Sequence, residues 1–465
     1  MSLRETALKG GMFLAGRQAL GMALGLIGIV LITRIIGPQQ YGFFAACVAI
    51  LGYIRSFASL GIDVYLVRKP GDLTQEDLNQ AFSFLLVVTT VFGVGLYILR
   101  DPMARALGMP EVGPLFGVLA LTVPFSLIHV PAMAQMDRAL AFKQSAVNEV
   151  LSQALQYLVA VPLALTGAGA WSLVAGWMAS TLSMCVLTYR SAGYRPGFHW
   201  DRTLVRQMLG YGIAFSSSIW VWQLRLLVNP VVVGRFAGAE AVGYVALAIR
   251  ICEMLSFAKG AVWRVSIAAL SRMANDAERL RKSINEGMRL QAISVALPLA
   301  AFAILAPFAV HGIFGEKWDP VVQVYPFISV GYLANSLFNL HSSVLYVLRE
   351  NWSVTIFHAA HVILFAGSAM LLVPSMNIFG YGWAEIAALG SYVLIHSMVQ
   401  RRIGSPSYAG ALIWFLSGSG AIVLGARGAP AAYFAPVVML VPLLLPAERA
   451  SLLAHARLLL PKPRT

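Results

Sequence analysis

Charged residues are scarce in this chain of 465 residues, in which Asp, Glu, Lys and Arg make up 12% and hydrophobic residues 58%. Soluble domains carry roughly a quarter charged residues. With a mean hydropathy of +0.74 over the whole chain, the apolar side chains are too many to be buried in soluble cores. The composition therefore excludes a water-soluble globule and predicts an all-α integral membrane protein with many spans.

Cysteine and the motifs of soluble enzymes are also nearly absent. The three cysteines lie in apolar runs without a CxxC spacing, which argues against a disulfide framework or a zinc site. The chain has no Walker loop, HExxH or GxSxG motif. His358 and His361 lie three residues apart without an evident third ligand, so hydrogen bonds between helices are expected there. We expect no catalytic residue, no metal and no cofactor; coupling to protons or sodium ions stays open.

Apolar runs long enough to cross a bilayer alternate with polar breaks along the whole chain. A bilayer core of about 30 Å needs about 20 helical residues. Fourteen runs of this kind are found, and the last two are the least distinct, which leaves a count of twelve open. The runs are 12–33, 41–62, 80–99, 115–135, 146–166, 170–189, 208–229, 241–262, 290–314, 321–347, 353–373, 380–399, 408–425 and 430–446. No cleavable signal peptide is expected, because the first run is longer than a signal sequence and contains Arg17.

Acidic residues are outnumbered by basic ones, 20 against 34, which gives a net charge of +14. In a membrane protein this excess indicates cytoplasmic loops that face anionic lipid, rather than binding to nucleic acid. If the N-terminus is cytoplasmic, most of the Lys and Arg residues outside the runs fall on the cytoplasmic side. We therefore expect an even number of spans, with both termini in the cytoplasm.

The chain also repeats itself. The segment Arg34-Ile-Ile-Gly37-Pro-Gln-Gln-Tyr41-Gly42-Phe43 matches Arg235-Phe-Ala-Gly238-Ala-Glu-Ala-Val242-Gly243-Tyr244 at an offset of 201, and Gly167-Ala-Gly169 matches Gly380-Tyr-Gly382 at 213. Each copy holds six runs, an even number, so both copies enter the membrane in the same direction. This predicts two parallel six-helix lobes around a central cavity, 1–199 and 200–402, followed by two C-terminal helices and a tail in 403–465. Such a geometry is typical of alternating-access transporters.

Basic residues within the runs or at their edges fall only on the first two helices of each copy. They are Arg17, Arg55, Arg225, Arg250, Lys259 and Arg264. A charge that faces lipid costs several kcal/mol, so we expect Arg17, Arg55, Arg225 and Lys259 to line the cavity. Arg250 is a further candidate, although it could simply pair with Glu253, and salt bridges between the lobes are the competing interpretation. Guanidinium donors match phosphate oxygens, so an anionic amphiphile fits a cavity of this kind.

Few acidic residues lie in or near the runs. Asp63, Glu149 and Glu385 are the candidates for proton or sodium coupling, since coupling needs a carboxylate in a polar membrane site. Several tryptophans could stack on sugar rings, although anchoring at the membrane interface is the more common role of this residue. They are Trp171, Trp177, Trp220, Trp222 and Trp263.

Four groups of residues together resemble a known family. They are Arg34-Ile-Ile-Gly37-Pro-Gln-Gln-Tyr41-Gly42, then Leu60-Gly61 with Leu66-Val67-Arg68, then Arg138 with Phe142-Lys143, and Thr166-Gly167-Ala168-Gly169-Ala170-Trp171-Ser172-Leu173-Val174. Over roughly residues 5–400 the chain resembles the polysaccharide-unit flippases of the multidrug/oligosaccharidyl-lipid/polysaccharide exporter superfamily, in the branch for exopolysaccharide, lipopolysaccharide and teichuronic acid export.

The resemblance implies an inner-membrane flippase of twelve to fourteen helices. It would move undecaprenyl-diphosphate-linked oligosaccharide from the cytoplasmic to the periplasmic leaflet by alternating access. Implied partners are the lipid-linked oligosaccharide, membrane lipids, and a polysaccharide polymerase with chain-length and export machinery. The cationic cavity would hold the diphosphate or an acidic sugar.

Three other functions stay open on the sequence. A multidrug cation antiporter of the same superfamily would favour an acidic cavity, whereas the embedded bases here outnumber the acids. An integral-membrane glycosyltransferase or polymerase would need a large loop with catalytic acids, and no such loop separates the runs. A scaffold for a polysaccharide assembly complex is the third.

Overall fold

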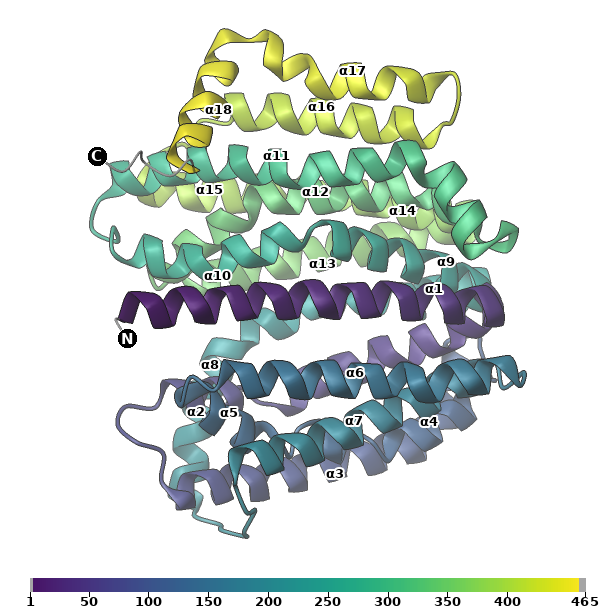
Figure 1. Cartoon of the computed structure of the whole chain (residues 1–465), viewed down its shortest axis with the longest axis vertical. Coiled ribbons are helices and arrows are strands. Elements are labelled where there is room, and N and C mark those ends of the chain that lie inside the picture. Colours follow the sequence, from purple (N-terminus) through teal and green to yellow (C-terminus); the bar gives the residue numbers. More distant parts are fainter. Residues whose placement is uncertain (1–2, 460–465) are drawn as a thin grey trace. The chain divides into compact units, whose positions relative to one another are not determined.

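The computed structural model describes the backbone of residues 3–459. Within that range, side chains are described except at 3–20, 22–23, 214–215, 258, 261, 263–265, 268 and 454–459. The described backbone is helical and contains no β-strand (Figure 1). The predicted all-α class is therefore confirmed. The side chains of Arg17, Trp263 and Arg264 lie outside the description.

The first half of the chain forms nine α-helices and three short 3₁₀ or π segments. They are α1 (Leu3–Ala58), α2 (Ile62–Arg68), α3 (Gln75–Ala106), α4 (Val112–Ala120), η1 (Pro124–Ser126), α5 (Val130–Arg138), α6 (Phe142–Leu165), α7 (Ala170–Ala192), α8 (Arg202–Gln223), η2 (Leu224–Leu227), η3 (Asn229–Val233) and α9 (Gly234–Leu255). Polar caps begin several of them. Asp201 accepts hydrogen bonds from the backbone amides of Thr203 and Leu204 at the start of α8, and the amide of Thr203 in particular lowers the pKa of the Asp201 carboxyl.

The second half has the same character. Its elements are α10 (Phe257–Ser271), α11 (Ala277–Ala309), η4 (Val310–Phe314), η5 (Glu316–Trp318), α12 (Pro320–Val347), α13 (Asn351–Met376), α14 (Ile378–Ala388), η6 (Leu389–Ser391), α15 (Tyr392–Ile403), α16 (Ala409–Ala426), η7 (Ala431–Phe434), α17 (Ala435–Leu440), η8 (Val441–Leu444) and α18 (Pro446–Leu459). In Figure 1, α11 and α16 lie side by side, as do α16 and α17.

Within the described residues, nine helices are long and apolar enough to cross a membrane, or up to eleven if each of two bent pairs is one span. One bent pair joins α4 to η1 and α5 with a bend of 64°, and the other joins 431–444 to 446–453. Two of the nine are themselves interrupted, at Gly37 in α1 and at Gly238 in α9, where the backbone leaves the helical conformation. A multi-span membrane protein is thus confirmed, whereas the count of fourteen stays a prediction.

Large apolar side chains are exposed on the outer faces of many helices. Ile98 of α3 is 68% exposed, Leu158 of α6 70%, Phe308 of α11 79% and Leu371 of α13 79%. Exposed apolar surface on helix after helix is unfavourable in water and favourable in lipid. The helices therefore present the faces that a bilayer would cover.

The two copies of the sequence repeat have the same backbone at their centres. Gly37 has φ 77° and ψ 173°, and Gly238 has φ 83° and ψ 176°; both angles suit glycine. The copies also pack against each other reciprocally. A Cβ added to Gly42 would lie 1.8 Å from the carbonyl oxygen of Ala239, and one added to Gly243 would lie 2.2 Å from that of Pro38. Gly42 and Gly243 are equivalent at the offset of 201, as are Pro38 and Ala239, so the two contacts are related by the repeat.

The chain divides into two compact units. The first holds residues 1–246 with 373–378, and the second holds 247–372 with 379–465. Helix α8, which follows the predicted end of the N-lobe at residue 199, belongs to the first compact unit. The boundary predicted at residue 199 separates the two copies of the sequence repeat, whereas the compact units are defined by packing. The predicted boundary stays a prediction.

Candidate functional site

A cavity with two chambers opens within the first unit. The first chamber has a volume of about 420 Å³ and is bounded by α1, α2, α5 and α8. An apolar cluster that includes Ala58, Leu66, Leu85 and Met208 packs α1, α2, α3 and α8 together beside it. The residues that line the first chamber are Arg55, Ser56, Ser59, Asp63, Val64, Val67, Leu127, His129, Val130, Met133, Ala134, Asp137, Ser216, Ile219, Trp220 and Gln223.

The second chamber is bounded by α1, α5, α6 and α7 and has a volume of about 340 Å³. Its lining residues are Arg55, Ser126, His129, Met133, Glu149, Ser152, Gln153, Trp177, Ser180, Thr181 and Met184. Arg55, His129 and Met133 line both chambers, so the chambers meet at these three side chains. Each volume falls in the range of small-molecule sites, about 300–1,000 Å³.

Arg55 is the cation at the junction. It lies in the last turn of α1, within the apolar span 24–58. In the described part of the chain, no hydrogen bond or ion pair holds its guanidinium group. His129 lies beside it with 6% of its surface exposed, and its Nδ1 is 3.2 Å from the carbonyl oxygen of Phe125. Because a carbonyl only accepts, Nδ1 carries the proton.

Carboxylates stand on either side of Arg55. Asp63 of α2 lines the first chamber and Glu149 of α6 lines the second. The Asp63 side chain is exposed to its chamber, yet the surrounding protein removes most of the bulk water. This desolvation raises the pKa of Asp63, while nearby backbone amides and the Arg55 charge act in the opposite direction. The cavity thus has acids on both sides of Arg55, with Asp63 and Asp137 in the first chamber and Glu149 in the second.

Two hydrogen bonds join α8 to α1 at the wall of the first chamber. Trp220 Nε1 donates to the carbonyl oxygen of Ser56 at 2.8 Å, and Gln223 Nε2 donates to the Ser56 hydroxyl at 2.7 Å. The Trp220 ring also lies 4.9 Å from that of Phe57, centroid to centroid. These contacts hold the Trp220 ring at the chamber wall beside Arg55.

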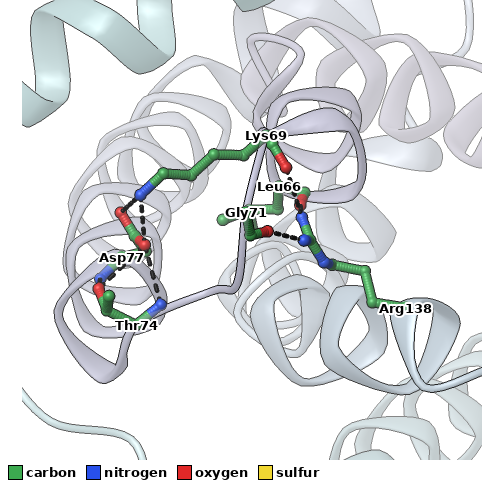
Figure 2. Close-up of polar contacts among 6 residues, drawn as sticks. All are labelled: Leu66, Lys69, Gly71, Thr74, Asp77 and Arg138. Carbon is green, nitrogen blue, oxygen red and sulfur yellow. Dashed lines mark hydrogen bonds and ion pairs between the residues drawn. The ribbon is translucent and has the colours of Figure 1, made fainter.

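Arg138 joins α5 to the end of α2, as Figure 2 shows. Its guanidinium group donates to the carbonyl oxygens of Leu66 at 3.2 Å and Lys69 at 2.8 Å, and also to that of Gly71. These carbonyl groups lie at or just beyond the C-terminus of α2. The last carbonyls of a helix have no backbone N–H within the helix to bond with. Both α2 and α5 line the first chamber, so Arg138 fixes the relative position of two of its walls.

The start of α3 is held to the same loop (Figure 2). Lys69 Nζ donates to Asp77 Oδ1 at 2.6 Å, and the Asp77 side chain is 2% exposed. Thr74 and Asp77 exchange hydrogen bonds in a capping box. A buried acid with this many donors stays ionised and anchors the short 69–74 connection.

The remaining predicted cation of the first unit is Arg225, in η2. It is half-buried, and its guanidinium carbon lies 5.0 Å from the centre of the Trp222 ring. Neither residue lines the two chambers described above.

Three predicted site residues lie in the second unit. Lys259 Nζ donates to Asn335 Oδ1 at 2.9 Å and stands 4.8 Å from the centre of the Tyr332 ring. Arg250 lies 3.7 Å from Glu253 in an exposed i, i+3 pair, the arrangement given above as the alternative to a cavity role. Glu385 of α14 is 3% exposed and packs against Gly331 of α12.

Histidines form hydrogen bonds between helices in the second unit. His361 Nδ1 lies 2.9 Å from the Ser391 hydroxyl, in line with the prediction for this histidine. His341 and His396 both contact the Tyr408 hydroxyl, at 2.6 and 2.7 Å. Among the described residues, no three His, Cys, Asp or Glu side chains are grouped as metal ligands.

Sequence reasoning missed His129, Gln153 and Thr181, which line the cavity. The signal for the last two was available, because polar residues recur at helical spacing in two apolar runs. On α6 and α7 these are Glu149, Ser152, Gln153, Ser180 and Thr181. His129 gave no signal of its own, since its position depends on the bend between α4 and α5.

The fold is shared with a solved lipid flippase and with solved multidrug transporters. The lipid II flippase MurJ in an inward closed conformation aligns with 97% of this chain and 100% of its own, with a TM-score of 0.74 and 11% identity. A multidrug resistance MATE family transporter of the MOP superfamily, in an inward-facing conformation, aligns with 87% of this chain and 96% of its own, with a TM-score of 0.57 and 18% identity.

Residues 31–323 match the polysaccharide biosynthesis protein family, and the chain belongs to that family. It is 24% identical to the succinoglycan biosynthesis transport protein ExoT of Rhizobium meliloti (strain 1021), over 63% of this chain and 60% of ExoT. It is 23% identical to the lipopolysaccharide biosynthesis protein WzxC of Escherichia coli (strain K12), over 74% of this chain and 70% of WzxC. The predicted family is therefore confirmed.

Proposed function

We propose that this protein moves a prenyl-diphosphate-linked oligosaccharide from the cytoplasmic to the periplasmic leaflet by alternating access, for the synthesis of a surface polysaccharide. Its family, the flippase fold and the names of its relatives support this function. The observation that carries the proposal is Arg55, a membrane-embedded cation that lies in a polar cavity and whose guanidinium group makes no hydrogen bond or close ion pair with a described residue.

The geometry suits a diphosphate at Arg55. A guanidinium group offers forked donors that match two phosphate oxygens. Inside the protein, attraction between the charges is several times stronger than in water, because the effective dielectric constant is lower. The prenyl tail would stay in lipid, so the charged and sugar groups cross through the polar cavity and avoid the cost of entering hydrocarbon.

A multidrug antiporter is the alternative that shares this fold. A lipophilic cation would be repelled by Arg55 at the junction of the chambers. In this proposal, transport makes and breaks no covalent bond and needs no cofactor. The protein lies in the inner membrane with both termini in the cytoplasm. A polysaccharide polymerase with its chain-length and export machinery would take up the product.

Ion coupling belongs to the same proposal. Asp63 lines the first chamber, and desolvation favours its protonated form. We assign proton coupling to Asp63 ahead of Glu149 and Glu385. A proton taken up on one side of the membrane would neutralise Asp63 and leave the Arg55 charge uncompensated, which strengthens its attraction for the diphosphate.

A reconstituted flipping assay tests the proposal. The purified protein is placed in liposomes with a labelled undecaprenyl-diphosphate oligosaccharide in the inner leaflet, and an external glycosidase reports its arrival outside. The wild type and an Arg250→Ala control should expose the sugar at similar rates, while Arg55→Ala should lower the rate at least tenfold. Arg55→Lys should recover part of it, because the charge is kept but the forked donors are lost.

Two results would count against the function. Normal flipping by a fully inserted Arg55→Ala variant would remove this residue from the mechanism. Export of a lipophilic cationic dye, together with no movement of any lipid-linked sugar, would favour the antiporter.

A further inference from the structure

The second chamber is lined by two polar stripes, one on α6 and one on α7. On each of α6 and α7 the stripe follows the i, i+3, i+4 spacing that places side chains on one face of a helix. The stripes are Glu149, Ser152 and Gln153 on α6, and Trp177, Ser180 and Thr181 on α7. Helices α6 and α7 lie side by side along their length (Figure 1), and both stripes border the same chamber.

Several polar atoms of these stripes are available to a ligand. Ser126 and Ser152 are occupied, since Ser126 Oγ donates to the Val123 carbonyl oxygen at 2.6 Å and Ser152 Oγ lies 3.8 Å from Met184 Sδ. Within the described part of the chain, the side chains of Gln153 and Thr181 and the indole nitrogen of Trp177 make no hydrogen bond. Polar groups inside a membrane protein usually find a partner, and those without one mark a functional surface.

Two of these side chains, Gln153 and Trp177, lie against α1. Gln153 lies against α1, where a Cβ added to Gly21 would be 3.4 Å from Gln153 Oε1. The Trp177 ring makes an edge contact with that of Phe44, with 6.3 Å between centroids. Next to the stripes α6 and α7 are in close contact, since a Cβ added to Gly176 would lie 2.6 Å from the Gln156 carbonyl oxygen. The backbones that carry the donors and the aromatic ring are therefore packed together without a ligand.

The charge of the second chamber argues against phosphate there. Arg55 at the junction supplies the positive charge among its described lining residues, and Glu149 adds a negative one. The other lining groups are hydroxyls, an amide, an indole and methionines. A set of neutral donors and acceptors around an aromatic ring suits a sugar, which presents many hydroxyls and an apolar face.

We propose that the second chamber is the subsite for the sugar nearest the diphosphate, with Trp177, Gln153 and Thr181 as specificity-determining residues. The inference rests on the proposed function, because the diphosphate is placed at Arg55. The sugar that follows it then lies against the Trp177 ring. Gln153 and Thr181 hydrogen-bond its hydroxyls, and Glu149 disfavours an acidic sugar.

Binding of lipids with and without a sugar tests this subsite. The full-length protein in detergent micelles is titrated, by scintillation proximity, with labelled undecaprenyl diphosphate and with the same lipid carrying glucose, galactose or N-acetylglucosamine. We expect at least one of the sugar-bearing lipids to bind roughly tenfold more tightly than the bare lipid. Each hydrogen bond contributes roughly two- to tenfold.

The variants separate the two parts of the ligand. Gln153→Ala combined with Thr181→Val should reduce the preference to below about threefold and leave the affinity for the bare lipid unchanged. Arg55→Ala should weaken both lipids equally. Gln144→Ala, an exposed glutamine on the same helix α6, should change neither. Trp177→Phe and Thr181→Ser should keep most of the preference, since they retain the ring and the hydroxyl, whereas Trp177→Leu should lose it.

Failure of the subsite can be told from failure of the function. If Gln153→Ala with Thr181→Val keeps the wild-type preference, or if the wild type prefers none of the three sugars, the subsite is refuted even when liposomes show flipping. If the variants behave as expected but no lipid changes leaflet, the subsite holds and the proposed function fails.

Discussion

The contact between the two repeat copies makes a sharp prediction about stability. Gly42→Ala and Gly243→Ala each place a methyl group against a backbone carbonyl oxygen, at 1.8 Å from that of Ala239 and 2.2 Å from that of Pro38. A carbonyl in a helix cannot rotate aside as a flexible side chain can. Since ordinary contacts begin at about 3.4 Å, the two segments must separate by more than about 1 Å to accept either methyl.

The cost follows from overpacking. Adding a methyl group to a filled site costs about 1–3 kcal/mol. A matched control is Gly52→Ala, also in α1, because a Cβ there meets no atom within 4 Å. Alanine in a free helical position gains about 1 kcal/mol over glycine. Gly42→Ala and Gly243→Ala should therefore be less stable than Gly52→Ala by about 2–4 kcal/mol, or at least roughly 4 °C in Tm.

Thermal unfolding of the purified variants in detergent measures this difference. The double variant should lose less than the sum of the single losses, because one separation of the segments relieves both clashes. If Gly42→Ala and Gly243→Ala melt within about 1 °C of Gly52→Ala, the reciprocal packing of the repeats is not what holds this region together.

Further predictions concern the cavity walls and the remaining charged residues. Arg138→Ala removes three hydrogen bonds at the end of α2 and should lower the free energy of unfolding by about 1–3 kcal/mol. Protease should then cleave the 69–74 connection faster, and an unchanged cleavage rate would contradict the role of Arg138 in joining α2 to α5. Asp63→Asn, which fixes the neutral form, should make flipping independent of a pH gradient, whereas a retained dependence would place coupling elsewhere. Arg250→Ala, from an exposed pair worth about 0.2–1 kcal/mol, should flip normally, and a lost rate would assign Arg250 to the substrate. Lys259→Ala and Asn335→Ala should lower the rate equally and the double variant no further; additive losses would show that Lys259 acts independently of Asn335.

The positions of the helices could be predicted from the sequence because lipid imposes a length on every span. Each predicted apolar run falls on one or more helices of the structure. Glycine also indicated where helices are interrupted, because Gly37 in α1 and Gly238 in α9 adopt a backbone conformation that other residues avoid. What the runs do not encode is how a helix is bent, and the 64° bend after α4 places His129 at the junction of the chambers.

The candidate site was predicted in part. Arg55 and Asp63 were identifiable because a charge in or beside an apolar run is costly and therefore conspicuous. Gln153 and Thr181 belong to polar stripes that are visible in the sequence, but the stripes alone do not mark a site, because a neutral polar residue in a membrane helix usually bonds to its neighbours. The sequence contains the polar stripes, but only the packing of α6 on α7 decides that they face an open chamber.

The arrangement of charges suits a carrier better than a receptor. A transporter has to release its substrate on the far side, so a site that binds a diphosphate with several unopposed cations would slow release. Here Arg55 stands between Asp63 in one chamber and Glu149 in the other, and these acids reduce the positive potential along both ways out of the junction. With phosphate affinity limited in this way, the neutral contacts to the sugar decide which lipid is carried, and discrimination comes from Trp177, Gln153 and Thr181 rather than from the charge.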